Sequence, residues 1–233
     1  MSHIRLTDMS VEIPLRGLRR RPGVDPRIRQ IPGGGLVVTA LRNITFEAEP
    51  GDRIGIIGGN GAGKTTLLRV IAGIIPPVSG TVEVSGQVHG IFNISDGMRT
   101  ALSGRENARL RYYLLDEPGG SLDNFIANVQ GFADLGEFFD LPMSTYSPGM
   151  TSRLLFAMST VKHANILLLD EWIGVADRAF QDKAASRLRE LVAGNEIFFI
   201  ASHDRTILRQ MTDRVIVLRQ GLLEKVIDTY ELD

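Results

Sequence analysis

Residues 58–66 read GGNGAGKTT, and this stretch decides the fold. Before it stands the β-branched run IGII at 54–57, and after it the apolar-periodic segment LLRVIAGI at 67–74. The stretch fits the pattern G-x-x-x-x-G-K-[ST] between a buried strand and a helix, where a glycine-rich backbone wraps phosphate with its N–H groups. A chance glycine-rich turn would carry neither the Lys-Thr pair nor both flanks, so we predict a nucleotide-phosphate site.

Single residues of this loop have distinct expected roles. Lys64 should reach the β- and γ-phosphates of ATP, and the Thr65 hydroxyl should bind Mg²⁺. The start of the following helix adds partial positive charge beside the phosphates. The residues that we expect to contact the nucleotide here are Gly58, Asn60, Gly61, Ala62, Gly63, Lys64, Thr65 and Thr66.

Two stretches compete for the catalytic carboxylates, LLDEPGG at 114–120 and LLLDEW at 167–172. A Mg²⁺-binding Asp in such a fold lies at the carboxyl end of a buried parallel strand. The first stretch follows SGRE at 103–106, a capping box that starts a helix, and its Pro-Gly-Gly stops that helix. Asp116 and Glu117 are therefore expected at a solvated helix end.

The second stretch has the features of a catalytic strand end. The continuous apolar run ILLL at 166–169 is typical of a strand that is buried on both faces. Asp170 falls at the end of this run and is expected to hold Mg²⁺, through a water molecule. Glu171 follows and should polarise the attacking water as general base.

The order of these motifs resembles that of the ATP-binding cassette (ABC) ATPases. YSPGM at 146–150 is similar to a variant of the family's signature pentapeptide, and it precedes the helix-like TSRLLFAMSTV. GVAD at 174–177 stands where the family has its D-loop, and IASHD at 200–204 supplies the strand-end His203. The resemblance implies a P-loop ABC nucleotide-binding domain that hydrolyses ATP with Mg²⁺.

A second pair of competing stretches concerns the signature pentapeptide. LSGRE at 102–106 looks more like the usual pentapeptide than YSPGM does. However, only 13 residues separate Ser103 from Asp116, too few for a helix and a returning strand. We therefore interpret the pair LSGRE and LLDEP as a chance similarity to the functional motifs.

Within this family the chain is similar to the ATPase subunits of bacterial O-antigen and capsular or teichoic polysaccharide exporters. The likeness is carried by SGREN at 103–107, FADLGEFFDLPMSTYSPGM at 132–150 and IGVADRAFQDKA at 173–184. It implies export of a lipid-linked polysaccharide through a polytopic permease, at the cytoplasmic face of the plasma membrane. Some members carry a C-terminal carbohydrate-binding domain, and none is expected in a chain that ends at Asp233.

The family also implies a composite site. Its cassettes sandwich two nucleotides head-to-tail, so Ser147 and Gly149 of one copy would contact the γ-phosphate held by Lys64 of a second copy. His203 would hydrogen-bond the γ-phosphate and sense its presence. Asp177 would lie at the seam of this homodimer.

Four positions depart from the family pattern. Pro148 removes one N–H donor from the signature, and Trp172 stands where most cassettes have proline. The adenine-stacking aromatic is absent, so Ile13 is expected to give aliphatic and weaker packing. The glutamine that usually touches Mg²⁺ is not evident, and Asn93 is the nearest polar candidate.

Composition sets the remaining limits. The 233 residues are 43% apolar with a net charge of −1, so no global field recruits nucleic acid, and the absence of cysteine excludes a disulfide framework. No apolar run suits a spanning helix or a signal peptide, so a cytosolic or peripheral protein is expected. We predict a single α/β domain over 1–233. Its core is formed by 1–91, with a β-rich N-terminal part, and by 166–233, and a helical subdomain is inserted at 92–165.

Alternatives remain open at this stage. For the arginine-rich segment 16–30, we favour a solvated hairpin or a disordered insertion. The alternative interpretation is a contact with anionic lipid headgroups or with the membrane partner. The cassette would alternatively serve another transported substrate, or act as a soluble ABC ATPase in DNA repair or translation. A P-loop kinase or GTPase is the third possibility, but no Asn-Lys-x-Asp guanine motif is found.

Overall fold

The protein divides into two compact units, which we describe separately. The core unit comprises Met1–Phe92, Asn165–Trp172 and Glu196–Asp233, and the helical unit comprises Asn93–Ala164 and Ile173–Asn195. The computed structural model describes the following residues: 1–15, 25–92, 95, 97–115, 120–161, 164–171 and 178–232.

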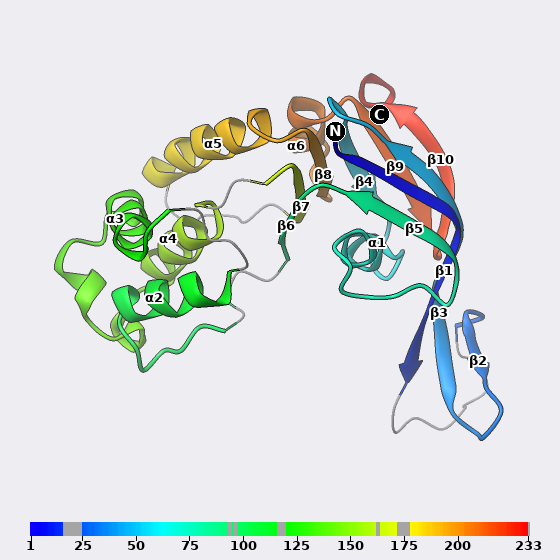
Figure 1. The fold of residues 1–233 in the computed structure, drawn as a ribbon, viewed down its shortest axis with the longest axis horizontal. Helices are drawn as coiled ribbons and strands as arrows, with labels where there is room; N and C mark the ends of the chain where they lie inside the picture. Colours follow the sequence, from blue (N-terminus) through cyan, green and yellow to red (C-terminus); the bar gives the residue numbers. More distant parts are fainter. Residues whose placement is uncertain are drawn as a thin grey trace. The chain divides into compact units, whose positions relative to one another are not determined.

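The core unit contains a six-stranded sheet in the order β10-β9-β4-β8-β7-β6 (Figure 1). Its pairs are parallel from β6 to β9, and only the edge pair β9–β10 is antiparallel. The strands are β4 (Arg53–Ile57), β6 (Val88–Ile91), β7 (Ile166–Asp170), β8 (Ile197–Ala201), β9 (Arg214–Arg219) and β10 (Leu222–Asp228). The apolar runs of β7 and β8 are fully buried, which confirms the strand that the sequence predicts at 166–169.

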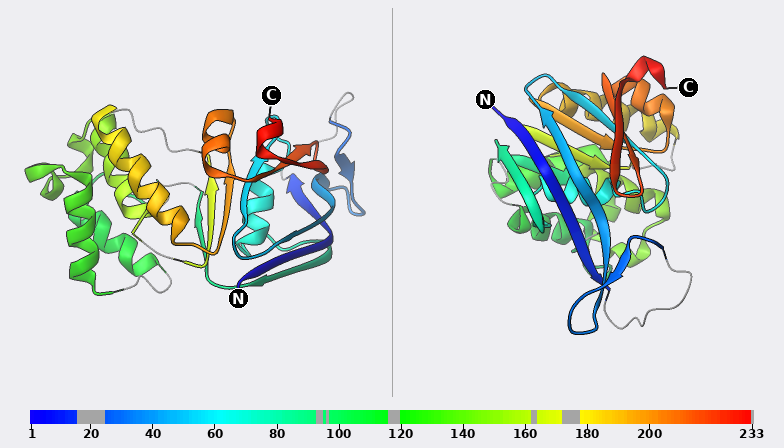
Figure 2. Two further views of the ribbon diagram at one scale, coloured as in Figure 1. Left: turned by 90° about the horizontal axis from the view of Figure 1, so that it is seen from above. Right: turned by 90° about the vertical axis from the view of Figure 1, so that its right-hand side faces the viewer.

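A second, antiparallel sheet has the order β2-β3-β1-β5. Its strands are β1 (His3–Leu15), β2 (Ile28–Gln30), β3 (Leu36–Ala48) and β5 (Ser79–Ser85). In the right-hand view of Figure 2, β1, β3 and β5 run side by side as a curved layer. This sheet is the β-rich N-terminal part that the sequence predicts.

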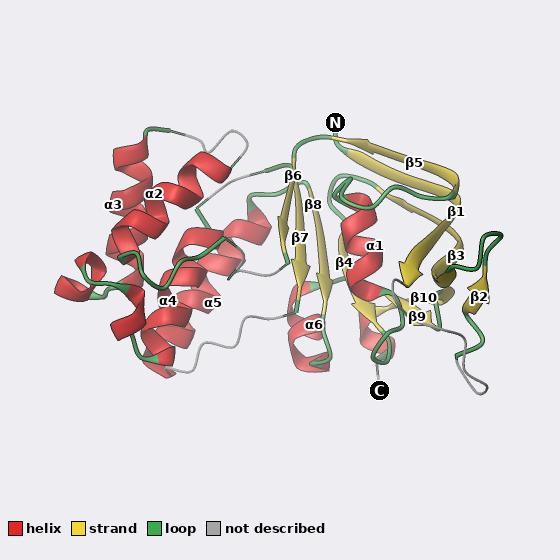
Figure 3. Ribbon diagram, turned by 90° about the horizontal axis from the view of Figure 1, so that it is seen from below, coloured by secondary structure: helices red, strands yellow, loops and turns green. Residues whose placement is uncertain are grey.

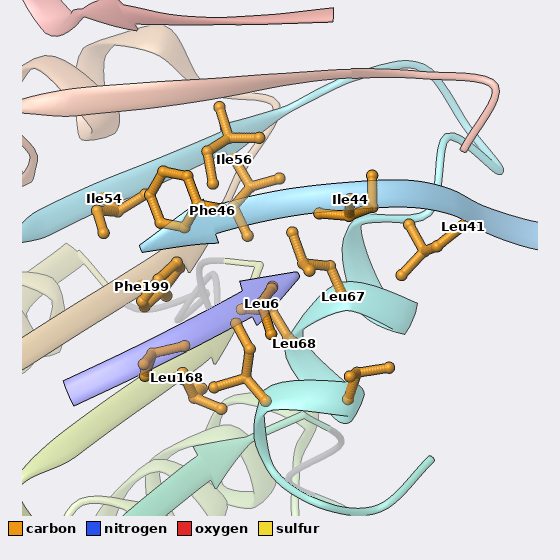
Figure 4. Packing of buried hydrophobic residues seen from close by; sticks show 14 of the residues in the cluster. Leu6, Leu41, Ile44, Phe46, Ile54, Ile56, Leu67, Leu68, Leu168 and Phe199 are labelled. Carbon is orange, nitrogen blue, oxygen red and sulfur yellow. The ribbon is translucent and has the colours of Figure 1, made fainter. Parts of the chain in front are cut away.

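Helix α1 (Lys64–Ile71) packs between the two sheets, where it contacts β3 and β5 on one side and β7 and β8 on the other (Figure 3). Leu67 and Leu68 of the helix join Leu6 and Ile44 from one sheet and Phe199 from the other in a single buried cluster (Figure 4). The glycine-rich loop thus starts from a helix that is anchored on both faces. The short helix α6 (Arg205–Met211) packs on β4. The 3-10 turn η3 (Thr229–Glu231) follows β10.

The helical unit contains four α-helices among the residues that the structure describes. They are α2 (Gly104–Leu114), α3 (Leu122–Ala133), α4 (Pro148–Ser159) and α5 (Arg178–Ala193), with 3-10 turns η1 (Gly136–Asp140) and η2 (Met143–Thr145). The capping box is confirmed, since the Ser103 hydroxyl accepts the Glu106 N–H and the Glu106 carboxylate accepts the Ser103 N–H at 2.8 Å. Asp116 and Glu117, the carboxylates of the competing Asp-Glu stretch, lie outside the described residues.

The division of the chain differs from the predicted one at α5. The sequence places residues 166–233 in the core, but the contacts group 173–195 with the helical unit. Phe180 of α5 is buried against Phe132 and Phe156, and Lys183 donates a hydrogen bond to the Phe132 carbonyl at 2.8 Å. An amphipathic pattern shows that a helix has an apolar face, but it does not show which partner covers that face.

No helix in the described part of the chain is both long enough and apolar enough to cross a membrane.

Candidate functional site

The glycine-rich loop connects β4 to α1 and is fixed by close backbone contacts. Gly63 has φ +110, and a Cβ added there would come within 2.7 Å of Leu41 Cδ2. A Cβ on Gly58 would come within 2.4 Å of the Leu218 carbonyl oxygen. Only glycine fits such positions. Helix α1 has no side-chain cap and no acidic residue in its first turn, so its N-terminal partial positive charge is available to an anion.

The Lys64 side chain folds back over the glycine-rich loop, so that its ammonium group faces the carbonyl groups at the start of the loop. The side chain is buried, with 8% of its residue surface exposed, and Nζ donates a hydrogen bond to the Gly58 carbonyl at 2.9 Å. His203 Nε2 lies 3.2 Å from the same Nζ. Because an ammonium group can only donate, the imidazole nitrogen is the acceptor in this contact. The loop lysine and the strand-end histidine are therefore direct neighbours.

Asp170 ends strand β7 and faces the first turn of α1. The Thr65 side chain hydrogen-bonds its carboxylate. Burial raises the pKa of Asp170, the hydrogen bond from Thr65 partly offsets this, and the neighbouring charge of Glu171 raises it further. A hydroxyl and a carboxylate side by side are hard oxygen ligands of the kind that Mg²⁺ prefers, so the predicted pair fits that ion.

Glu171 follows the strand in an uncommon backbone conformation. Its φ is +69, and its N–H donates a hydrogen bond to the Ala201 carbonyl at 2.8 Å. A left-handed conformation in a residue other than glycine costs about 1–3 kcal/mol and is concentrated at functional sites. The exposed side chain turns towards His203, with 3.6 Å between Oε1 and Nε2. The structure thus brings together five predicted site residues, which are Lys64, Thr65, Asp170, Glu171 and His203.

Ile13 and three residues that the sequence analysis did not identify line a hollow beside the loop. Arg27, Val38 and Ala40 are the unanticipated members, and the loop side of the hollow comprises Gly61, Ala62, Gly63, Lys64, Thr65 and Thr66. The hollow has a volume of about 300 Å³. Strand register explains part of it, because Ile13 and Ile28 both pair with Val38. Asn60 lines an adjoining hollow with Arg27 and Leu218.

Ser147 and Gly149 belong to the helical unit. The Ser147 hydroxyl caps α4 by accepting the Met150 N–H at 3.2 Å, and its own O–H remains a donor. Pro148 occupies the first helical turn, where a missing N–H costs no intrahelical bond. Together, Ser147 and Gly149 line a hollow of about 460 Å³.

Several predicted positions are outside the described residues, so their geometry stays a prediction. They are Asn93, Trp172 and Asp177.

Comparisons with known proteins identify the family. The family model described as ABC transporter matches residues 41–174, which is more than half of the chain. The O-antigen export system ATP-binding protein RfbE of Yersinia enterocolitica is 44% identical over 209 residues, covering 90% of this chain and 87% of that protein. The teichoic acids export ATP-binding protein TagH of Lactococcus lactis is 37% identical over 198 residues, covering 82% of this chain but only 42% of that protein.

Solved structures agree on the fold. A dimeric ATP-binding cassette in a post-hydrolysis state, bound to ADP and Pi, has a TM-score of 0.71 and covers 97% of this chain and 98% of its own. At 18% identity this likeness concerns the fold alone, and it confirms the predicted α/β fold class of an ABC nucleotide-binding domain. With the family model and the 44% identical relative, the conclusion extends beyond fold: the chain belongs to the ABC transporter family, as a cassette that hydrolyses ATP.

Proposed function

We propose that this cassette is the motor subunit of an exporter for a lipid-linked bacterial polysaccharide of the O-antigen, capsular or teichoic class. The observation that carries the proposal is the 44% identity over nearly the whole chain with an O-antigen export ATP-binding protein. Teichoic acids export ATP-binding proteins are also among the similar sequences, at 32% to 37% identity. The cassette would act at the cytoplasmic membrane as a peripheral subunit bound to a polytopic permease.

The geometry of the site residues supports a role for each of them. Lys64 would exchange its bond with the Gly58 carbonyl for the β- and γ-phosphates, which are stronger acceptors. Thr65 and Asp170 would hold Mg²⁺, which neutralises phosphate charge when bound. Glu171 would accept a proton from the attacking water, and His203 would donate a hydrogen bond to the γ-phosphate. The contact of His203 with both Lys64 and Glu171 supports this assignment.

The composite site would form between two copies of the chain. Ser147 and Gly149 lie at the start of α4, where a hydroxyl donor and backbone N–H groups suit an anion. We expect them to bind the γ-phosphate of the ATP held by a second copy, in a head-to-tail homodimer. Ile13 would pack against adenine from the hollow beside the loop.

ATP should drive dimerisation of the Glu171→Gln variant, because each γ-phosphate adds contacts across the seam while hydrolysis is blocked. A further Ser147→Arg change should abolish this dimer by steric clash. Light scattering with and without ATP measures the mass. Ser144→Arg is the matched control, since Ser144 is also exposed and lies three residues away in η2. A monomer at every ATP concentration would contradict the sandwich.

The cargo is tested in cells. Deletion of the gene should remove O-antigen or capsule from the surface and leave lipid-linked glycan on the cytoplasmic face. The wild-type chain should restore export, whereas Lys64→Ala should not, because it removes the phosphate ligand of the motor. Surface glycan is measured by immunoblot or gel. Normal surface glycan in a deletion strain without a second gene copy would refute polysaccharide export and leave the ATPase intact.

A further inference from the structure

The side chain of Arg27 is held in a fixed plane beside the glycine-rich loop. Its Nε and Nη2 donate to the Asp25 carboxylate at 3.0 and 2.6 Å, and its Nη1 donates to the Gly61 carbonyl at 2.7 Å. Only 17% of the side chain is exposed. Each of the three nitrogens is therefore engaged in the plane of the guanidinium group, which leaves two of its five N–H donors and its flat faces for a further ligand.

The hollow that Arg27 lines has an apolar wall on the strands. Ile13 of β1 and Val38 of β3 are paired residues in adjacent strands, and Arg27 directly precedes β2, whose Ile28 also pairs with Val38. The opposite wall is the loop and the first turn of α1. Among the described residues that line this hollow, none has an aromatic side chain. A nucleotide with its phosphates on the loop would have its base near this apolar wall.

The charge of Arg27 is balanced locally. The hydrogen bonds from Arg27 lower the pKa of the Asp25 carboxyl to about 2, so the carboxylate stays ionised at neutral pH. The two residues together carry no net charge, and Asp25 would repel a phosphate group that approached the same nitrogens. A neutral, flat ligand is a better match, because guanidinium groups stack on aromatic faces.

We propose that Arg27 is a nucleotide-positioning residue that stacks on the purine base, with Ile13 and Val38 as the apolar wall and Asp25 as the group that fixes the guanidinium plane. The Arg27–Asp25 pair would take the place of an aromatic base platform. The proposal rests on nucleotide binding at the Lys64 loop and is independent of which cargo the transporter moves.

The test compares ligands with and without a base. Calorimetry measures the affinity of the full chain for Mg-ADP, and competition measures its affinity for inorganic pyrophosphate. The variant Asp25→Asn/Arg27→Ala removes the pair without changing net charge. We expect it to weaken ADP binding about tenfold, the size of a buried cation–π contact, and to change pyrophosphate binding less than about twofold. Adding an aromatic face with Asp25→Asn/Arg27→Tyr should restore most of the ADP affinity.

The matched control removes a similar ion pair, which joins β1 and β2 of the same sheet. Arg29 bonds Glu12 at 2.7 Å and does not line the hollow, so Glu12→Gln/Arg29→Ala should leave both affinities unchanged. Equal losses of ADP and pyrophosphate affinity in the Arg27 variant would overturn the proposal, because they would mean that Arg27 only braces the loop through Gly61. Unchanged ADP affinity would overturn it as well. Failure of the wild type to bind ADP would refute the nucleotide site itself.

Discussion

Replacing Glu171 by glutamine is expected to lower the rate of ATP hydrolysis by about 10²- to 10⁴-fold, the usual contribution of a general base. Glutamine has nearly the same size and cannot accept the proton. The Glu171 N–H bond to Ala201 involves only the backbone and should persist in the variant. Lys64 and the loop are untouched, so the affinity for ATP should stay within about twofold. The variant thus separates binding from chemistry.

Phosphate release measures the rate, and calorimetry with ATP measures the affinity. Glu117→Gln is the natural control, because it changes the carboxylate of the competing Asp-Glu stretch. The sequence predicts a solvated helix end for Glu117, and a substitution there should leave turnover within about twofold. The opposite pattern, loss at residue 117 and activity at residue 171, would show that the catalytic strand has been misassigned.

Replacing Phe199 by alanine should have the largest effect on stability, about 3–5 kcal/mol in the free energy of unfolding. Phe199 is 0% exposed in the centre of the six-stranded sheet, and its ring meets Phe46 edge-on with centroids 6.2 Å apart (Figure 4). Removing the ring would leave a cavity between the two sheets, where α1 and both strand layers restrict collapse.

Urea titration followed by circular dichroism gives this free energy. Leu222→Ala is the control in the same unit, since Leu222 of β10 is 47% exposed and its loss should cost less than about 0.5 kcal/mol. A loss below about 1 kcal/mol for Phe199→Ala would contradict the packing of α1 between the sheets.

Local signals explain which parts of the fold are predictable from sequence. The loop pattern, the apolar run before Asp170 and the capping box at Ser103 each act within a few residues, and the structure contains all three elements as expected. Asp170 lies beside Thr65, and His203 beside Lys64, because parallel strands end at one edge of a sheet. The order of the motifs therefore predicts which residues lie near one another as well as where the strands are.

Tertiary contacts explain what the sequence did not predict. Segment 173–195 has an amphipathic helix whose apolar face fits either unit, so its grouping depends on Phe180 packing on Phe132. Arg27 is one of six arginines in a polar segment, and no local pattern distinguishes it from the others. Its place beside Gly61 follows from the pairing of β2 with β3, which fixes where the hairpin returns.

The hydrogen bond from the Glu171 N–H to the Ala201 carbonyl has a mechanical consequence. Ala201 ends β8, and His203 follows two residues later. Glu171 and His203, the proposed proton acceptor and γ-phosphate contact, are thus both tied to one strand terminus, and a displacement of that terminus would move both. Substitutions at this terminus should show strong epistasis with substitutions at either side chain, because correcting the position of one group alone would leave the other misaligned.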